Sequence, residues 1–220
     1  MRFDLHVHTY HSGDSLTAPA EIVGAVQRRG LAGVAIIDHN TIAGALELRE
    51  IAPFPVIVGE EIRTTHGEIA GLFMRELVPA GLSPEETISA IRAQGGLVYV
   101  PHPLDHFRRE ALGRRNLERI IEQVDILEVL NARNLFGRDN EAARQMALAH
   151  GLALGAGSDA HVPWEIGHAW VEVDACDGPA SFLAALRRGW VGGSLTTPLV
   201  HVLTTLTKLH RRVRGQRASH

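Results

Sequence analysis

The sequence predicts an α/β protein built on a parallel β-sheet, folded either as a barrel or as a doubly wound sheet. Short strand-like runs alternate with helix-like stretches along most of the chain, which is the pattern of repeated β–α units. Several runs are almost entirely apolar, as expected for strands buried on both faces of a parallel sheet. No internal repeat and no Pro/Gly/Ser-rich linker divides the 220 residues. We therefore expect one domain over residues 1–207 and a basic tail at 208–220.

Seven strands are predicted from short runs rich in apolar and β-branched residues. They cover residues 3–7, 33–37, 54–58, 96–100, 125–129, 152–156 and 169–173. The stretch 61–73 predicts a β-hairpin that turns at Thr65-His66-Gly67.

Helices are predicted between these runs. They cover residues 19–29, 42–51, 116–123, 138–150 and 179–188, and a further one begins after Ser83. Ser83-Pro84-Glu85-Glu86 supplies a capping hydroxyl, a first-turn proline and an acidic first turn, and Gly95-Gly96 ends that helix.

The composition is that of a globular chain, with 45% hydrophobic and 21% charged residues. A single cysteine, Cys176, permits no intrachain disulfide, which favours a reducing, cytoplasmic setting. The amino terminus carries Asp4, His6 and His8 where a signal peptide needs an apolar run, so we expect no secretion. The uncharged stretch 189–207 is rich in Thr and Gly, and we expect no membrane span there.

Polar side chains gather where the predicted strands end. Six strands deliver them: His6, His8 and Asp14; Asp38 and His39; Glu60 and Glu61; His102; Glu128 and Asn131; Asp159 and His161. In a parallel barrel the carboxyl ends of all strands open on one face, where active sites lie. His6 and His8 lie two residues apart on a strand, so their rings share a side.

Imidazole and carboxylate ligands without thiolates suit Zn, Mn or Fe. Five histidines accompanied by four carboxylates make nine candidate ligands, which exceed what one ion takes, so two or three divalent ions are implied. Clustered ions that share a bridging water are typical of hydrolases, because they lower the pKa of that water and neutralise charge on the reacting oxygens. A phosphate ester suits this chemistry, since it requires charge neutralisation and positioning more than a protein nucleophile.

Five motifs, in order over residues 1–175, resemble those of the polymerase and histidinol phosphatase (PHP) family. FDLHVHTYHSGDS resembles its first motif, H-x-H-T-x-x-S-x-D, and IIDHN its second. VIVGEEI resembles its Gly-x-Glu, while VPHP and GSDAH resemble its His-Pro and Asp-x-His motifs. The resemblance implies a distorted (β/α)7 barrel with a two- or three-metal centre at the carboxyl-terminal strand ends, and a metal-dependent phosphoric ester hydrolase.

The resemblance also implies roles for individual residues. One ion would be held by His6, His8, Glu61 and Asp159, and Glu61 would bridge to a second ion that uses His102. Asp14, His39 and His161 would hold a third. Catalysis would then rest on Glu61, Asp159 and His161.

The chain departs from the family pattern at Glu68, where the family has a histidine. Either Glu68 is a ligand, or His66 takes its place, or the second ion is weakly held. Away from the ions, Asp4 and Asp38 are expected to orient the histidines. Arg133 and Arg63 are expected to bind a phosphate group.

We expect an enzyme that hydrolyses a small phosphomonoester or a nucleotide through a metal-activated bridging water. The alternative is a non-catalytic or proofreading-type PHP module linked to nucleic-acid metabolism. The tail 208–220 carries five basic and no acidic residues, which favours nucleic acid; residues 1–207 carry 17 basic and 25 acidic residues, which disfavours it. A further alternative is an amidohydrolase-type barrel, which usually has a lysine at its metal ions. The only lysine in the sequence is Lys208, in the tail, which argues against this alternative.

Overall fold

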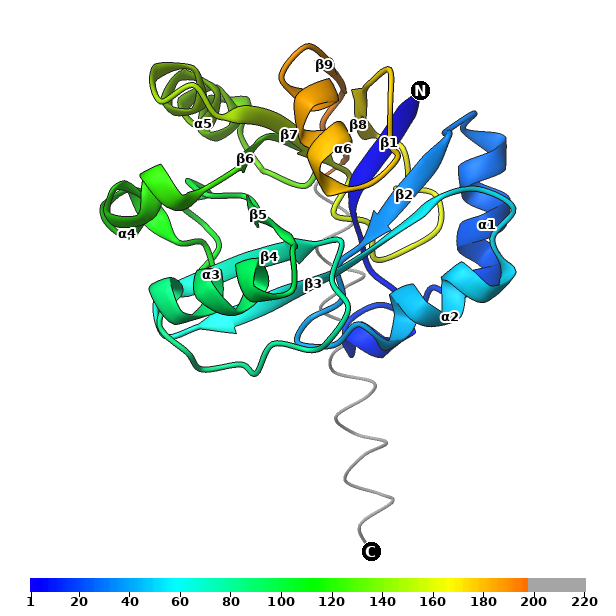
Figure 1. Ribbon diagram of the computed structural model, residues 1–220. Coiled ribbons are helices and arrows are strands. Elements are labelled where there is room, and N and C mark those ends of the chain that lie inside the picture. The colour runs from blue at the N-terminus through cyan, green and yellow to red at the C-terminus, as the bar shows by residue number, and fades with distance from the viewer. Residues whose placement is uncertain (198–220) are drawn as a thin grey trace, which may run out of the picture.

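The structure is a computed structural model that describes residues 1–197 (Figure 1). The predicted boundary at residue 207 and the basic tail lie outside the described residues. Strands are β1 (Arg2–Val7), β2 (Gly33–Ile36), β3 (Val56–Thr64), β4 (Gly67–Leu72), β5 (Leu97–Val100), β6 (Ile126–Asn131), β7 (Ala153–Gly157), β8 (Ala169–Glu172) and β9 (Trp190–Gly193). Helices are α1 (Pro19–Arg28), α2 (Ala43–Ile51), α3 (Pro84–Ala93), α4 (Gly113–Ile120), α5 (Gly137–Ala149) and α6 (Pro179–Leu186), with short 3-10 turns η1 (Tyr10–Ser12) and η2 (Ile121–Gln123). No helix in this part of the chain has the length and apolar character needed to cross a membrane.

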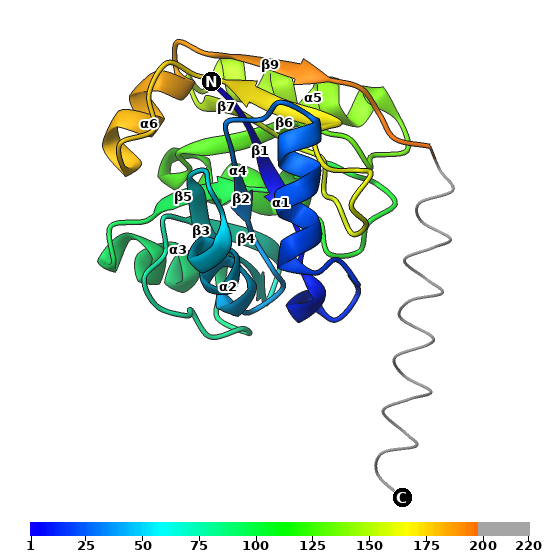
Figure 2. The same cartoon turned by 90° about the vertical axis from the view of Figure 1, so that its right-hand side faces the viewer.

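The nine strands form one sheet in the order β7-β6-β5-β4-β3-β2-β1-β8-β9. The sheet curls into a nearly closed barrel, because β7 at one edge lies beside β1 and β8 near the other. A parallel bridge between Val7 and Ala160 helps to join the two sides. Helices α1 to α5 lie around the outside of this barrel (Figures 1 and 2). The α/β barrel class predicted from the sequence is confirmed.

Two departures from seven uniform β–α units have a clear cause. The hairpin β3–β4, which the sequence predicted for residues 61–73, makes β4 antiparallel to β3. Strand β4 also runs antiparallel to its other neighbour, β5, which was not predicted. The predicted strand 169–173 is β8, which runs antiparallel to β1. The segment between β7 and β8 contains no helix, and a parallel return requires a long crossover. The edge strand β9, which pairs with β8, was not predicted.

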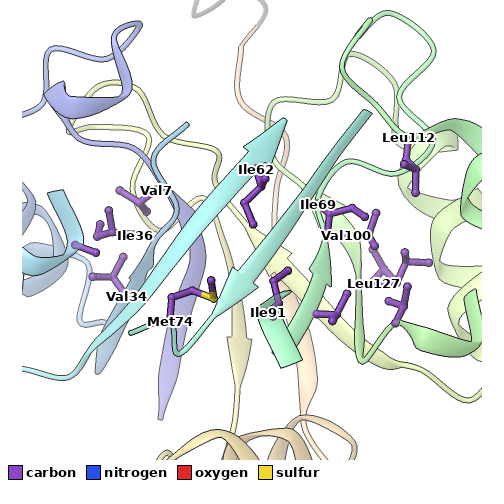
Figure 3. Packing of buried hydrophobic residues seen from close by; sticks show 14 of the residues in the cluster. Val7, Val34, Ile36, Ile62, Ile69, Met74, Ile91, Val100, Leu112 and Leu127 are labelled. Atoms are coloured by element: carbon purple, nitrogen blue, oxygen red, sulfur yellow. The ribbon is translucent and has the colours of Figure 1, made fainter. Parts of the chain in front are cut away.

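Two apolar clusters stabilise the barrel. The outer cluster packs the sheet against its helices, with Ile91 of α3 among its members (Figure 3). The inner cluster fills the end of the barrel where β1 begins, and Phe182 of α6 packs edge-on against Phe3 with ring centroids 5.8 Å apart. Burying such side chains contributes about 1.5–3 kcal/mol each. The opposite end of the barrel is therefore left for polar side chains.

Candidate metal centre

The end of β1 turns its histidines into the barrel through a local irregularity. Phe3 and Leu5 belong to the inner cluster, whereas Val7 belongs to the outer one. The register of β1 against β2 shifts between Asp4 and Val7, as in a β-bulge. This shift exchanges the two faces, so His6 and His8 both point inward and are fully buried. Bulges of this kind re-aim side chains next to functional sites.

The structure brings all nine predicted ligand side chains together at this end of the barrel. A first group contains His6, His8, Glu61 and Asp159. The two Nε2 atoms lie 3.1 Å apart, and their distances to Glu61 Oε2 and Asp159 Oδ1 run from 3.4 to 3.7 Å. Neighbouring ligands of a tetrahedral ion with bonds of about 2.1 Å lie about 3.4 Å apart. The distances from the two histidines to the two carboxylates are thus close to ligand spacing, and donor atoms of His6, His8 and Glu61 all lie within 4.8 Å of one another.

A second group lies on the other side of the Glu61 carboxylate. His102 Nε2 is 2.8 Å from Glu61 Oε1 and 3.8 Å from Glu68 Oε2. His39 Nδ1 is 3.6 Å from Glu68 Oε1. The Glu68 side chain is only 3% exposed, so it points into the centre from the hairpin rather than to solvent. His66 is exposed at the hairpin turn, where its Nδ1 contacts Thr65 Oγ1.

A third group faces the cavity above the centre. Asp14 Oδ2 lies 3.3 Å from His39 Nε2 and 3.2 Å from His161 Nε2. The ring of His161 is also 4.4 Å, centroid to centroid, from that of His8. The three groups are therefore continuous, with Glu61 and His39 between them.

Two buried carboxylate oxygens in this cluster indicate what kind of ligand it could hold. Neither Glu61 Oε2 nor Asp159 Oδ1 accepts a hydrogen bond from the described residues, although histidine nitrogens lie 3.0–3.7 Å away. A buried charged oxygen without a partner is costly. Asp14 and Glu68 add two more carboxylates to the same space. The donor set therefore fits divalent cations that accept both imidazole and carboxylate ligands, such as Mn, Zn or Fe.

The charges of the protein atoms alone are poorly balanced here. Burial would lower the pKa of His6, but Asp159, Glu128 and Glu61 outweigh burial and hold that pKa well above its usual value. Burial, and next the Glu61 carboxylate, raise the pKa of Glu68 to about 8. Strong perturbation of this kind is typical of functional sites.

Glu128 orients the centre, a role that the sequence did not reveal. His6 Nδ1 lies 3.0 Å from Glu128 Oε1 and donates its proton to it, so in the neutral ring that an ion binds the Nε2 lone pair would face the cluster. Glu128 also accepts from the Tyr99 hydroxyl, the His102 backbone amide and Asn131 Nδ2 at 2.6, 2.6 and 2.9 Å. The sequence feature that could have pointed to this role is the position of Glu128 within the otherwise apolar run ILEV, where a carboxylate is buried only with partners.

Asp4 and Asp38 were expected to orient the histidines, but within residues 1–197 neither is hydrogen-bonded to an imidazole ring. Asp4 accepts from the backbone amides of His6, Ser158 and Gly167. Asp38 accepts from the amide and hydroxyl of Thr9 at 2.6 and 2.7 Å. Asp4 therefore joins β1 to the segment between β7 and β8, and Asp38 joins the end of β2 to the residue that follows β1 by two positions.

Two of the predicted ligands have a strained backbone. His102 has φ 28° and Asp159 has φ 55°, in the left-handed region that non-glycine residues rarely adopt. The bond from the His102 amide to Glu128 helps to hold the first of these. Strain of this kind persists where surrounding contacts over-determine the conformation, as at active sites.

A cavity of about 640 Å³ opens above the centre, and three arginines line it. Arg108 donates to Asp159 Oδ2 over 2.6 Å and is 19% exposed. The buried Arg133 lies against His161 and the Asp159 carbonyl. Arg63 is 61% exposed and lies 3.6 Å from Glu110. The two predicted phosphate-binding arginines thus line the cavity, and Arg108 joins them; its signal was its position six residues after His102.

Comparison with known proteins agrees with this geometry. A family model described as PHP domain matches residues 4–95, and a PHP-associated model matches residues 137–191. The chain is 42% identical to the uncharacterized protein MJ1587 of Methanocaldococcus jannaschii over 156 residues, which are 65% of this chain and 89% of that protein. It is 35% identical to MJ0417 of the same organism over 175 residues, 78% of this chain and 70% of that protein.

The fold is shared with a two-domain protein of Bacteroides vulgatus that contains a predicted PHP-like metal-dependent phosphoesterase. The TM-score is 0.73 at 20% identity, and the match covers 88% of this chain and 65% of that protein. This likeness concerns the fold.

Proposed function

The chain belongs to the PHP family, and from this premise we propose that it is a metal-dependent phosphoric ester hydrolase acting on a small phosphomonoester or nucleotide. The observation that carries the proposal is the joining of the ligand cluster to the cavity. Glu61 Oε2 and Asp159 Oδ1 are two buried oxygens that accept no hydrogen bond from residues 1–197, and other members of the same cluster, Asp14, His39, Glu68 and His161, line the cavity together with arginines.

We assign two or three divalent ions, Mn, Zn or Fe, to the three groups of side chains. The first would lie among His6, His8, Glu61 and Asp159; the second among Glu61, Glu68 and His102; the third among Asp14, His39 and His161. Bound ions of this kind supply an activated water and neutralise charge on the phosphate oxygens.

The remaining work falls to the chain's own residues. Arg108 and Arg133 would grip the phosphate oxygens, because a guanidinium offers several N–H donors in a planar fork. Arg108 is already fixed by Asp159, so little side-chain freedom is lost on binding. Of the three proposed catalytic residues, His161 lines the cavity, whereas Glu61 and Asp159 lie deeper. Arg63, at the exposed edge, would bind more weakly.

The ligand set departs from the family pattern only at Glu68, which argues against a non-catalytic module, from which ligands would have been lost. The acidic balance of residues 1–207 argues against a polyanionic partner. We therefore propose a small phosphorylated substrate, and a cytoplasmic setting consistent with the single, half-buried Cys176.

The test is release of inorganic phosphate from a panel of phosphomonoesters, nucleotides and short oligonucleotides. We expect activity to require added divalent metal after chelation, and Glu61→Gln to lower it by orders of magnitude. The matched control is Glu122→Gln, a carboxylate on η2 whose side chain is 86% exposed and lies 3.4 Å from His150. Normal rates in chelated protein or in Glu61→Gln would contradict the proposal.

A further inference from the structure

The rim of the cavity carries an exposed apolar surface, which a charged phosphate group would not contact favourably. It consists of Phe107, Leu135 and Phe136, which we call the aromatic rim. Their exposed fractions are 60%, 37% and 45%. Phe107 and Leu135 line the cavity itself. Single exposed apolar residues are common, but a cluster beside a polar site marks a binding surface.

The two rings of the aromatic rim are held in place. The Phe107 and Phe136 centroids lie 5.5 Å apart with the planes tilted by 46°. The Arg138 guanidinium lies 5.0 Å from the Phe136 centroid, a cation–π contact. The Phe107 amide donates to Asp105 Oδ1 over 2.9 Å, which fixes its loop. A rigid ring offers its face to a ligand at low entropic cost.

The same two loops carry the aromatic rim and the arginines of the centre. Arg108 follows Phe107 directly and reaches Asp159. Arg133 precedes Leu135 by two residues and lies against His161. A phosphate held between these arginines would leave the rest of its ester in the cavity, beside the rim. The cavity of about 640 Å³ lies in the middle of the range for small-molecule sites and has room for more than a phosphate.

We propose that the substrate is a phosphomonoester whose leaving group carries a planar ring, of the nucleobase type, that stacks on Phe107 with Phe136 supporting it. This inference rests on the proposed function and specifies its substrate class. A sugar phosphate would leave the rim in water. An alkyl chain is a poor match, because Asp105 and Glu110 also line the cavity and would lose water to it. A nucleobase has an apolar face for the rings and polar edges for such groups.

The test compares adenosine 5′-monophosphate and uridine 5′-monophosphate with ribose 5-phosphate, which has the same phosphate and sugar but no base. Calorimetry gives binding and phosphate release gives KM. Wild-type protein should bind the nucleotides at least tenfold more tightly than ribose 5-phosphate. Phe107→Ala should weaken nucleotide binding about tenfold, within the range for base–aromatic stacking, and leave ribose 5-phosphate unchanged. Phe107→Trp, which keeps an aromatic ring at this position, should retain the nucleotide binding that Phe107→Ala loses. Trp190→Ala is the matched control, an exposed aromatic on β9.

Equal binding of nucleotides and ribose 5-phosphate, or equal effects of Phe107→Ala on both, would overturn the inference and leave the hydrolase proposal intact. A change in sedimentation with Phe107→Ala, without any change in nucleotide binding, would overturn it in favour of an interface between protein chains. Tighter nucleotide binding that Phe107→Ala abolishes, without phosphate release from any compound, would support the rim and count against the hydrolase.

Discussion

Glu128 offers the sharpest test of how the centre is organised. Each of its oxygens accepts two hydrogen bonds: Oε1 from His6 Nδ1 and the Tyr99 hydroxyl, and Oε2 from the His102 amide and Asn131 Nδ2. Glu128→Gln keeps the shape but replaces one acceptor oxygen with an N–H₂ group. Two of the four groups that donate hydrogen bonds to Glu128 would then face this N–H₂ group, which is itself a donor.

The magnitude follows from burial, because both partners of the Glu128–His6 pair are inaccessible to solvent. Removing one partner of a buried pair costs about 3–5 kcal/mol in free energy of unfolding. Glu128→Gln also weakens the hold on the His6 tautomer that directs Nε2 inward. Loss of such an orienting partner lowers metal affinity about 10–100-fold. The milder Tyr99→Phe removes one donor and should cost about 1 kcal/mol.

The assay is calorimetric titration of metal-free protein with Mn²⁺ or Zn²⁺, together with denaturant unfolding. Glu60→Gln is the matched control, because Glu60 is equally buried on β3 but points away from Glu61 and accepts from the Val78 amide. Glu60→Gln should change the free energy of unfolding without changing the affinity for metal ions. Unaltered metal affinity in a folded Glu128→Gln protein would refute the orienting role.

Three further outcomes are expected. Glu68→Ala should lose about one bound ion per chain, whereas Glu68→His should keep the ion count and shift the preference toward Zn²⁺; an unchanged count in Glu68→Ala, measured by elemental analysis, would exclude Glu68 as a ligand. Truncation after Thr207 should leave turnover of small phosphomonoesters unchanged, and a salt-dependent loss confined to oligonucleotides would instead favour a nucleic-acid substrate. Burial, and next Asp177, raise the pKa of Cys176 to about 11, so its thiolate is scarce below that pH. The native thiol should react with a disulfide reagent at pH 8 about 100-fold more slowly than urea-unfolded protein, and the rate should rise with pH; equal rates would contradict this.

The sequence predicted the sheet and the ligands well because both depend on local patterns. Buried strands appear as apolar runs, and the polar residues that end them stand out by contrast. The hairpin was predicted because a Gly-containing turn separates two runs at Thr65-His66-Gly67. The antiparallel direction of β8 was not predicted, because strand direction depends on whether a long crossover such as a helix lies between two strands.

What the sequence could not show are contacts between distant segments. Arg108 and Asp159 are 51 residues apart, and Glu128 is 122 residues from His6. No spacing rule joins such pairs. The inward turn of His8 also depends on the β1 irregularity, which only the register against β2 reveals. Asp4 and Asp38 were expected to orient the histidines, and they accept hydrogen bonds from backbone amides and hydroxyl groups. The sequence does not distinguish these two roles.

The central claim is that side chains from six strand ends form a multi-ion centre on which phosphate release depends. The most direct measurement is a Mn²⁺ titration of metal-free protein in which bound ions and phosphate release are followed together. The account predicts no release without metal, and release that rises with occupancy to a plateau at two or three ions per chain. Full turnover without bound metal, or saturation of binding with no release from any phosphate ester, would contradict it.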